Sequence, residues 1–117
     1  MVSSLGINTA ALKAFGTKMD VTAKNIANVN SEEFKKSRAT LKAGPNGNVQ
    51  VDVETIDTPG PSVVSEEGGQ ATKKELSNVD FSEEISEMII AKHGYGANLK
   101  AIKAQDEVLG EAIDILG

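Results

Sequence analysis

The sequence predicts a mainly α-helical protein, with two long terminal helices and a small β-hairpin and loop segment between them. Three observations lead to this fold class: apolar repeats of seven residues near both ends, period-two alternation in the middle, and few aromatic residues. The 117 residues fit one domain and include three Phe, one Tyr and no Trp. A core built from Ala, Val, Ile and Leu favours long helices over a compact globule.

The N-terminal segment, residues 1–30, predicts a helix from Leu5 to Val29. Apolar residues recur there at seven-residue intervals, and some companion positions three residues later are apolar as well. The apolar members of this stripe are Leu5, Leu12, Phe15, Met19, Ile26 and Val29. Asn30 can take the left-handed backbone conformation that ends a helix, so we expect the helix to stop there.

The C-terminal segment, residues 78–117, has a stronger repeat and predicts a helix from about Asp80 to Leu116. Most of its heptad positions are apolar, with Lys92 and Asp106 as the exceptions. The apolar positions are Phe81, Ile85, Met88, Tyr95, Leu99, Ile102, Leu109, Ile113 and Leu116. Asp80 and Glu83 have the spacing of a capping box, which marks the start of the helix.

Gly94 and Gly96 flank Tyr95 in the middle of the second predicted helix. Each glycine costs a helix about 1 kcal/mol relative to alanine, so two of them need a reason. One interpretation is a local kink without a role. The other is that a neighbouring backbone approaches closely, or that the helix bends there to fit an assembly.

The middle segment, residues 31–77, predicts a β-hairpin and loops. Val49, Val51 and Val53 alternate with polar residues, which is the spacing of a strand. The turn residues of "AGPNGN" separate residues 35–42 from residues 49–56, and we expect these two stretches to pair. The stretches "DTPGPS" and "SEEGGQATKK" are interpreted as loop. A lone hairpin is marginal in water, so it must pack on the helices or on another chain.

The charge and composition exclude several classes of protein. A net charge of −5 argues against nucleic acid as a partner, because binding phosphates needs clustered Lys and Arg. Residues 1–30 carry +2 and residues 78–117 carry −5, which matches the two helices as partners. The absence of cysteine excludes disulfides and thiolate metal sites. No apolar run approaches the roughly 20 residues of a membrane span, and we expect no cleaved signal peptide.

No catalytic, cofactor-binding or metal-binding constellation is expected. His93 is the only histidine, and no carboxylate or serine stands where it would complete a catalytic group. Glu83, Glu84 and Glu87 are interpreted as a solvated helix face near the positive end of the helix dipole. The favoured hypothesis is a protein without enzymatic activity that works through its surfaces.

Asn25 and Asn28 lie side by side on the flank of the first apolar stripe. Asparagine is a mediocre helix former, so amides at this density need an explanation. One interpretation is a polar helix end exposed to water. The other is that both amides form hydrogen bonds across a tightly packed contact between chains, where they fix the register.

Two motifs, in the same order, resemble the axial proteins of the bacterial flagellum, the rod and hook family. Residues 19–36, "MDVTAKNIANVNSEEFKK", are similar to the N-terminal signature "LDVTANNIANVNTPGYKR" of that family. The closing helix is similar to the last helix of the family at Tyr95, Ala97, Asn98, Lys100, Ile102, Asp106, Glu107 and Leu109. The short middle segment most resembles small proximal rod subunits. The turn departs from the family, because "NSEEF" stands in place of "NTPGY" and has neither Pro nor Gly.

The resemblance implies that the terminal helices pack as an antiparallel, coiled-coil-like pair and that many copies assemble into a hollow helical axis. It implies a structural subunit of the flagellar basal-body rod, exported by the flagellar type III apparatus without a cleaved signal and located in the periplasm-spanning rod. Its expected partners are copies of itself, other axial subunits and the export apparatus, with no nucleic acid and no membrane insertion. The expected assembly interface comprises the apolar residues of both stripes together with Asn25, Asn28 and Asn98.

A second hypothesis comes from another class of protein. A small helical binding module, such as a secretion chaperone or adaptor, could grip the amphipathic helix of a partner with its own apolar groove. Such a module would not need the amide-rich "NIANVN" run. The two hypotheses predict different locations for the chain, the basal body for a rod subunit and the cytosol for a chaperone or adaptor.

Overall fold

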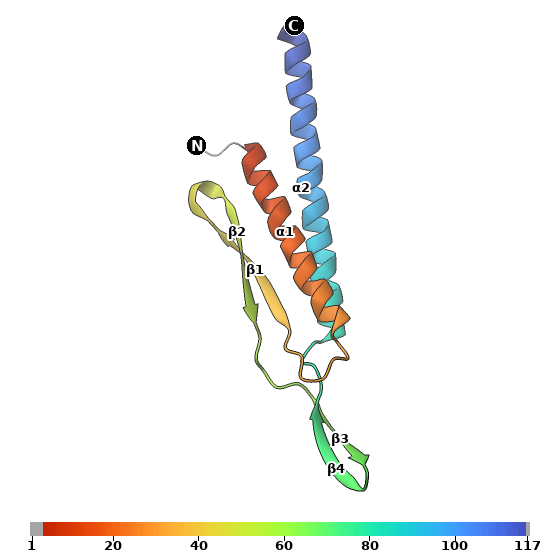
Figure 1. The fold of residues 1–117 in the computed structure, drawn as a ribbon. Helices are drawn as coiled ribbons and strands as arrows, with labels where there is room; N and C mark the ends of the chain where they lie inside the picture. The colour runs from red at the N-terminus through yellow and green to blue at the C-terminus, as the bar shows by residue number, and fades with distance from the viewer. Residues whose placement is uncertain (1–3, 117) are drawn as a thin grey trace.

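The computed structural model describes residues 4–116 of the chain, and the side chains of residues 6–115. Its elements in chain order are α1 (Ser4–Ala27), β1 (Ser37–Ala43), the short 3₁₀ helix η1 (Pro45–Gly47), β2 (Val49–Thr55), β3 (Ser62–Glu67), β4 (Gln70–Glu75) and α2 (Phe81–Leu116). Figure 1 shows α1 and α2 packed side by side and running in opposite directions. The expected antiparallel pair of terminal helices is confirmed.

Both helices begin and end within two residues of the predicted bounds. α1 ends at Ala27 rather than Val29, and α2 begins at Phe81 rather than Asp80. Asp80 caps α2, because its Oδ1 accepts the backbone N–H groups of Ser82 at 3.0 Å and Glu83 at 3.4 Å. The cap satisfies donors that have no partner inside the helix.

The helix pair packs through small side chains. Among the described residues, the buried apolar side chains are Ala11, Ala14, Ala39 and Ala91, and three of these four lie on the two helices. Alanine lets two helix backbones approach closely, since only a methyl group separates them. The core is therefore a narrow seam, in keeping with a composition poor in aromatic residues.

α2 is longer than α1, and its C-terminal part continues past the N-terminal end of α1 (Figure 1). α1 has 24 residues and α2 has 36, so about 12 residues of α2, or roughly 18 Å of helix, have no counterpart in α1. We refer to residues 106–116 as the α2 overhang. The molecule is elongated, with extents of 82 × 24 × 17 Å.

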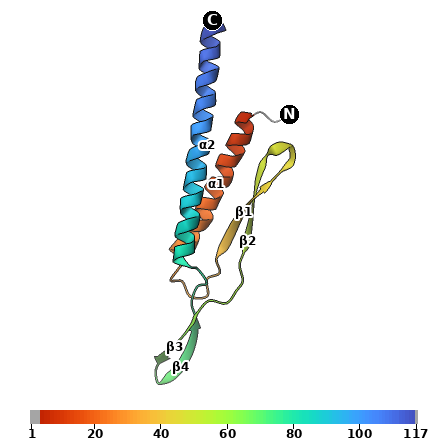
Figure 2. The same ribbon diagram turned by 180° about the vertical axis from the view of Figure 1, so that it is seen from behind.

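β1 and β2 form the predicted hairpin and pack against α1. Their antiparallel register runs from Ser37 opposite Thr55 to Ala43 opposite Val49. Figure 2 shows from behind how this hairpin lies beside α1. The hairpin thus obtains from α1 the support that an isolated two-stranded ribbon lacks.

A second hairpin, β3–β4, corrects the interpretation of "SEEGGQATKK" as loop. β3 and β4 pair from Ser62 opposite Glu75 to Glu67 opposite Gln70. Gly68 (φ +63°) and Gly69 (φ +79°) form the two-residue turn, whose two positive φ angles match the twist of a hairpin. The interpretation was wrong because polar residues on both faces hide the strand alternation. The hairpin extends from the end of the helix pair opposite the α2 overhang (Figure 1).

The turn after α1 corrects a second expectation. The residue with a left-handed backbone is Glu33 (φ +60°), not Asn30. Glu33 stands where the similar family signature has the glycine of "NTPGY", and it has the left-handed backbone that glycine adopts most easily. The backbone N–H of Glu33 donates to the carbonyl oxygen of Glu75 at 3.0 Å, which ties this turn to the end of β4.

Candidate assembly interface

Two aromatic rings and two glycines interlock at the middle of the helix pair. A Cβ added to Gly94 would lie 2.4 Å from Cε1 of Phe15, and one added to Gly16 would lie 3.8 Å from Cε2 of Tyr95. Gly94 therefore makes room for the ring of Phe15, so the group that approaches this glycine is a side chain and not the neighbouring backbone that we expected. Gly96 has no such neighbour, because a Cβ there would meet nothing within 4 Å.

Asn25 links three elements of the fold. Its Nδ2 donates to the carbonyl oxygen of Ser37 at 2.8 Å and to Oε2 of Glu84 at 3.1 Å. Its Oδ1 accepts the backbone N–H of Ser37 at 3.0 Å. Asn25 and Glu84 are both 0% exposed, so this amide fixes the positions of β1 and α2 relative to α1 within one chain.

Glu84 corrects the interpretation of the three early glutamates of α2 as a solvated face. Its Oε1 accepts a hydrogen bond from Nη2 of Arg38 at 2.9 Å, while Oε2 is held by Asn25. A buried carboxylate is tolerated when both oxygens are paired with donors and one donor is charged. Glu87 is only half-buried and forms an ion pair with Lys18 of α1 at 2.7 Å. The solvated-face interpretation holds for Glu83, which is exposed and pairs with Lys36 and Arg38.

The other two asparagines of the expected assembly interface, Asn28 and Asn98, form hydrogen bonds with residues three or four positions away in the chain. Nδ2 of Asn28 donates to the carbonyl oxygen of Lys24 at 2.9 Å, and its Oδ1 accepts from Oγ of Ser31 at 3.0 Å. Nδ2 of Asn98 donates to the carbonyl oxygen of Gly94 at 2.8 Å. Asn28 therefore forms its hydrogen bonds at the C-terminal end of α1. Asn98 binds the backbone carbonyl of Gly94, the glycine that makes room for the ring of Phe15.

The predicted apolar stripes divide into a half-buried part and an exposed part. The half-buried members are Leu12, Phe15, Met19, Ile26, Val29, Met88, Tyr95 and Ile102. The exposed members are Phe81, Ile85, Leu99, Leu109 and Ile113. The side chains of Leu5 and Leu116 lie outside the part of the chain whose side chains are described.

The large apolar side chains of the α2 overhang have exposed fractions at or above those of the exposed apolar side chains in the rest of the helix pair. Leu109 is 56% exposed, Val108 64%, Ile113 67% and Ile115 85%. Its charges are all acidic, since residues 106–116 contain Asp106, Glu107, Glu111 and Asp114 but no Lys or Arg. Clustered apolar side chains that their own chain leaves uncovered mark a surface for a partner.

A shallow groove lies where the middle of α1 meets α2. Its lining includes the apolar side chains of Leu12, Met19 and Tyr95, together with Gly16. Lys13 and Asp20 line it as well, and both are exposed. The groove combines an apolar floor with polar edges, which suits the side of an amphipathic helix.

Sequence reasoning missed the junction where the turn after α1, the end of β2 and the start of α2 meet. Asn78 holds it: Oδ1 accepts the backbone N–H of Lys36 at 2.7 Å, and Nδ2 donates to the carbonyl oxygens of Ile56 at 2.8 Å and Thr58 at 2.9 Å. No periodic pattern marks Asn78. Its place two residues before the cap of α2 is the only sequence feature that points to it.

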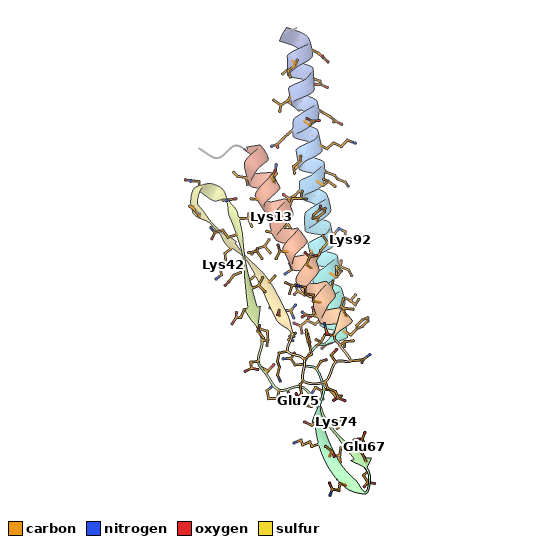
Figure 3. The ribbon with its side chains drawn as sticks, in the orientation of Figure 1. Lys13, Lys42, Glu67, Lys74, Glu75 and Lys92 are labelled. Atoms are coloured by element: carbon orange, nitrogen blue, oxygen red, sulfur yellow. The ribbon has the colours of Figure 1, made fainter. Side chains whose placement is uncertain are left out.

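Glu75 and Lys35 form an ion pair at the same junction, and Figure 3 labels Glu75 where the chain leaves β4. One carboxylate oxygen of Glu75 also accepts the backbone N–H of Gly60 at 3.0 Å. The hydrogen bond from Lys35 and, to a lesser degree, that from Gly60 lower the pKa of Glu75 below its ordinary value of 4.5.

The described residues contain no group of three or more His, Cys, Asp or Glu side chains that could hold a metal ion. His93 is exposed on α2. Within residues 4–116, no helix is both long and apolar enough to cross a membrane. The apolar overhang and the groove are two features that the described part of the chain offers to a partner.

Two families match the chain, one at each helix. Residues 7–35 match the family described as flagella basal body rod protein, and residues 74–115 match the family described as flagellar basal body rod FlgEFG protein C-terminal. The first match covers most of α1 and the turn that follows it, and the second covers almost all of α2.

The similar proteins are axial proteins of the flagellum. The flagellar basal-body rod protein FlgG of Bacillus subtilis (strain 168) is 44% identical over 41 residues, which are 35% of this chain and 16% of the relative. The flagellar hook proteins FlgE of Escherichia coli (strain K12) and Salmonella typhimurium are each 42% identical over 41 residues, 35% of this chain and 10% of the relative. The matched segment thus spans less than a fifth of the length of these relatives.

Proposed function

Because the chain belongs to the flagellar basal-body rod and hook family, we propose that it is a structural subunit of the basal-body rod. It is a flagellar structural protein and not an enzyme. In the proposed function, its terminal helices assemble with copies of itself and with other axial subunits to build a helical axis for motility. The observation that carries the proposal is that both helices of one packed pair match the family, while the longer helix ends in uncovered apolar side chains.

The energetics of the overhang support assembly. Full burial of a Leu, Ile or Val side chain contributes about 1.5–3 kcal/mol, and four such side chains of the overhang are more than half exposed. Covering them on assembly would contribute several kcal/mol before the cost of ordering is subtracted. The apolar stripe residues of both helices, with Asn25, Asn28 and Asn98, are the proposed assembly machinery. Asn25 would act through the fold of each subunit, because its hydrogen bonds lie within one chain.

The rod is proposed over the hook because of the segment between the helices. That segment holds only two small hairpins and their connections. A subunit of this shape adds little bulk outside the helix pair. We propose that it reaches the periplasm-spanning rod through the flagellar type III apparatus, without a cleaved signal, and binds neither nucleic acid nor the interior of the membrane.

Purification of intact basal bodies, followed by detection of this chain with a specific antibody, tests the proposed function. Recovery of the chain in the basal-body fraction, in constant ratio to other rod proteins, is the expected result. Recovery only in the cytosol would favour the helical binding module, such as an export chaperone or adaptor. A deletion strain supplies the control for the antibody and should lose motility.

A further inference from the structure

We propose that Asn46 is a self-modification site: its side chain reacts with the backbone nitrogen of Gly47 when the β1–β2 hairpin opens, and the closed hairpin protects it. This inference goes beyond the proposed function and does not depend on it. Asn46 is the only asparagine of the chain that is followed by glycine. Asparagine is a chemically labile residue, and glycine places no Cβ beside the attacking nitrogen.

The reaction consumes water and no other reactant. A base in solution takes the proton from the backbone N–H of Gly47, and the nitrogen forms a bond to Cγ of Asn46. The Cγ–Nδ2 bond breaks and Nδ2 leaves as ammonia, so a cyclic imide remains. Water then opens the imide at either carbonyl. Opening at Cγ gives aspartate, and opening at the main-chain carbonyl gives isoaspartate, whose backbone runs through the former side chain.

The closed turn holds the two reacting groups apart. Asn46 has φ +60° and ψ +31°, and Gly47 has φ +74°. In this left-handed conformation the Cβ of a residue lies beside its own carbonyl oxygen. The next nitrogen is bonded to the same carbonyl carbon on the other side, so the nitrogen of Gly47 points away from the side chain of Asn46. Attack on Cγ therefore needs rotation about the Cα–C bond of Asn46, which opens the turn.

Contacts around the tip of the hairpin keep the turn closed. The backbone N–H of Asn48 donates to the carbonyl oxygen of Pro45 at 3.2 Å, and that of Gly44 donates to the carbonyl oxygen of Asn48 at 2.7 Å. The tip also lies near the start of α1 (Figure 1), since a Cβ added to Gly47 would be 3.9 Å from Cδ1 of Ile7. The reaction should therefore follow local opening of the hairpin.

The side chain of Asn46 has no protection of its own. Asn46 and Gly47 are exposed, and no hydrogen bond holds the amide of Asn46 among the described residues. Asn30 is exposed as well, but its nucleophile would be the backbone N–H of Ser31, which donates to the carbonyl oxygen of Asn28 at 2.9 Å. Ser31 also has a Cβ beside that nitrogen. Asn30 is therefore the internal control for Asn46.

The modification would keep the hairpin from closing as before. Asn-Gly suits this turn because both of its central positions need a positive φ. Isoaspartate adds a methylene group to the main chain between positions 46 and 47. The turn then no longer has the length that brings the N–H of Asn48 to the carbonyl oxygen of Pro45. One opening event can thus become permanent.

Mass spectrometry of the full chain tests the site and its protection together. The purified chain is kept at mildly alkaline pH in native buffer and, in parallel, in concentrated guanidinium chloride, and the conversion of each asparagine is measured after digestion. In guanidinium chloride, residue 46 should be converted faster than Asn30. In native buffer, conversion of residue 46 should be at least about tenfold slower than in guanidinium chloride. Equal rates in the two solutions would refute the protection, and a rate no higher than that of Asn30 in guanidinium chloride would refute the site.

Two matched variants test whether opening of this hairpin controls the rate. Leu41 lies opposite Val51, on the face of the hairpin that carries the buried Ala39. Leu41→Ser should raise the rate at residue 46 in native buffer by about threefold or more, because it weakens the packing of the hairpin. Val64→Ser changes an exposed valine of the other hairpin and should leave the rate unchanged. An unchanged rate in Leu41→Ser, or an equal rise in Val64→Ser, would contradict control by the first hairpin.

Asn46→Gly tests the consequence of the modification. This variant lacks the reactive amide, and glycine is accepted at both central positions of the turn. After the same incubation in guanidinium chloride and refolding, the hairpin amides of the natural chain should exchange hydrogen faster, in proportion to its isoaspartate content. Those of Asn46→Gly should be unchanged. An equal change in both chains would show that modification of residue 46 does not open the hairpin.

Discussion

Asn25 and Glu84 meet at the contact between α1, α2 and β1, where Nδ2 of Asn25 donates to Oε2 of Glu84 at 3.1 Å and neither side chain is exposed. The amide also pairs with both backbone groups of Ser37. This arrangement explains why an amide stands in the last part of α1. It joins two helices and a strand whose apolar core is otherwise small.

Replacement of Asn25 by Ala should lower the free energy of unfolding by about 2–4 kcal/mol. The substitution leaves the backbone groups of Ser37 and one oxygen of Glu84 without partners in a buried place. Asn28→Ala is the matched control and should cost under about 1 kcal/mol, since its hydrogen bonds are local and only part-buried or exposed. Denaturation in urea measures both, and equal losses would refute the role given to Asn25.

Alanine should have opposite effects at Gly94 and Gly96 of α2. At Gly94 the new methyl group would overlap the ring of Phe15, so we expect a loss of about 1–3 kcal/mol despite the better helix propensity of alanine. At Gly96 the methyl group meets nothing, so we expect a gain of about 0.5–1 kcal/mol. Thermal unfolding of the two variants gives the comparison. Phe15→Leu should recover part of the loss in the Gly94→Ala background, and no recovery would count against the overlap as its cause.

Replacement of Glu33 by Gly should raise the free energy of unfolding by about 0.5–1 kcal/mol. Glu33 has a left-handed backbone, which strains a side chain with a Cβ, although glycine also gains freedom in the unfolded state. Glu32→Gly tests the same chemical change at a neighbouring exposed residue whose φ is not positive, and it should be neutral or mildly destabilising. Higher stability for both variants, or for neither, would contradict the strain assigned to Glu33.

The ion pair of Glu75 should make stability depend on acid pH. The pKa of Glu75 is lower in the folded chain than its ordinary value of 4.5, so its contribution is complete above about pH 5 and is lost as the pH falls through the lower folded value. Glu75→Gln should be less stable than the natural chain at neutral pH, and the difference should shrink on acidification. Urea denaturation at several pH values between about 2 and 7 measures this, and a pH-independent difference would exclude the carboxylate as its source.

Local patterns in the sequence predicted the helices and the first hairpin. Apolar repeats define α1 and α2, Asp80 marks the cap of α2, and alternating valines define β2. The second hairpin was missed because β3 and β4 are mostly polar, and the Gly68–Gly69 pair is also compatible with a loop.

Long-range contacts explain what the sequence could not predict. Glu84 looks like an ordinary surface carboxylate near a helix start, and its burial depends on Asn25, 59 residues away in the chain. Gly94 gave two interpretations of equal weight until the position of Phe15 was known. The left-handed turn residue was assigned to Asn30 from the general preference of asparagine, whereas the bond between Glu33 and Glu75 depends on the whole junction.

The amount of this chain in purified basal bodies, compared between the natural sequence and the variant Leu109→Ser/Ile113→Ser, tests the central claim most directly. Both side chains are more than half exposed, so the substitutions should leave the subunit folded, and Val63→Ser/Val64→Ser on β3 controls for loss of exposed apolar surface elsewhere. We predict that the natural chain and the β3 control are recovered with basal bodies and that the overhang variant is absent from them. Recovery of the overhang variant in the same amount as the natural chain would contradict assembly through the overhang.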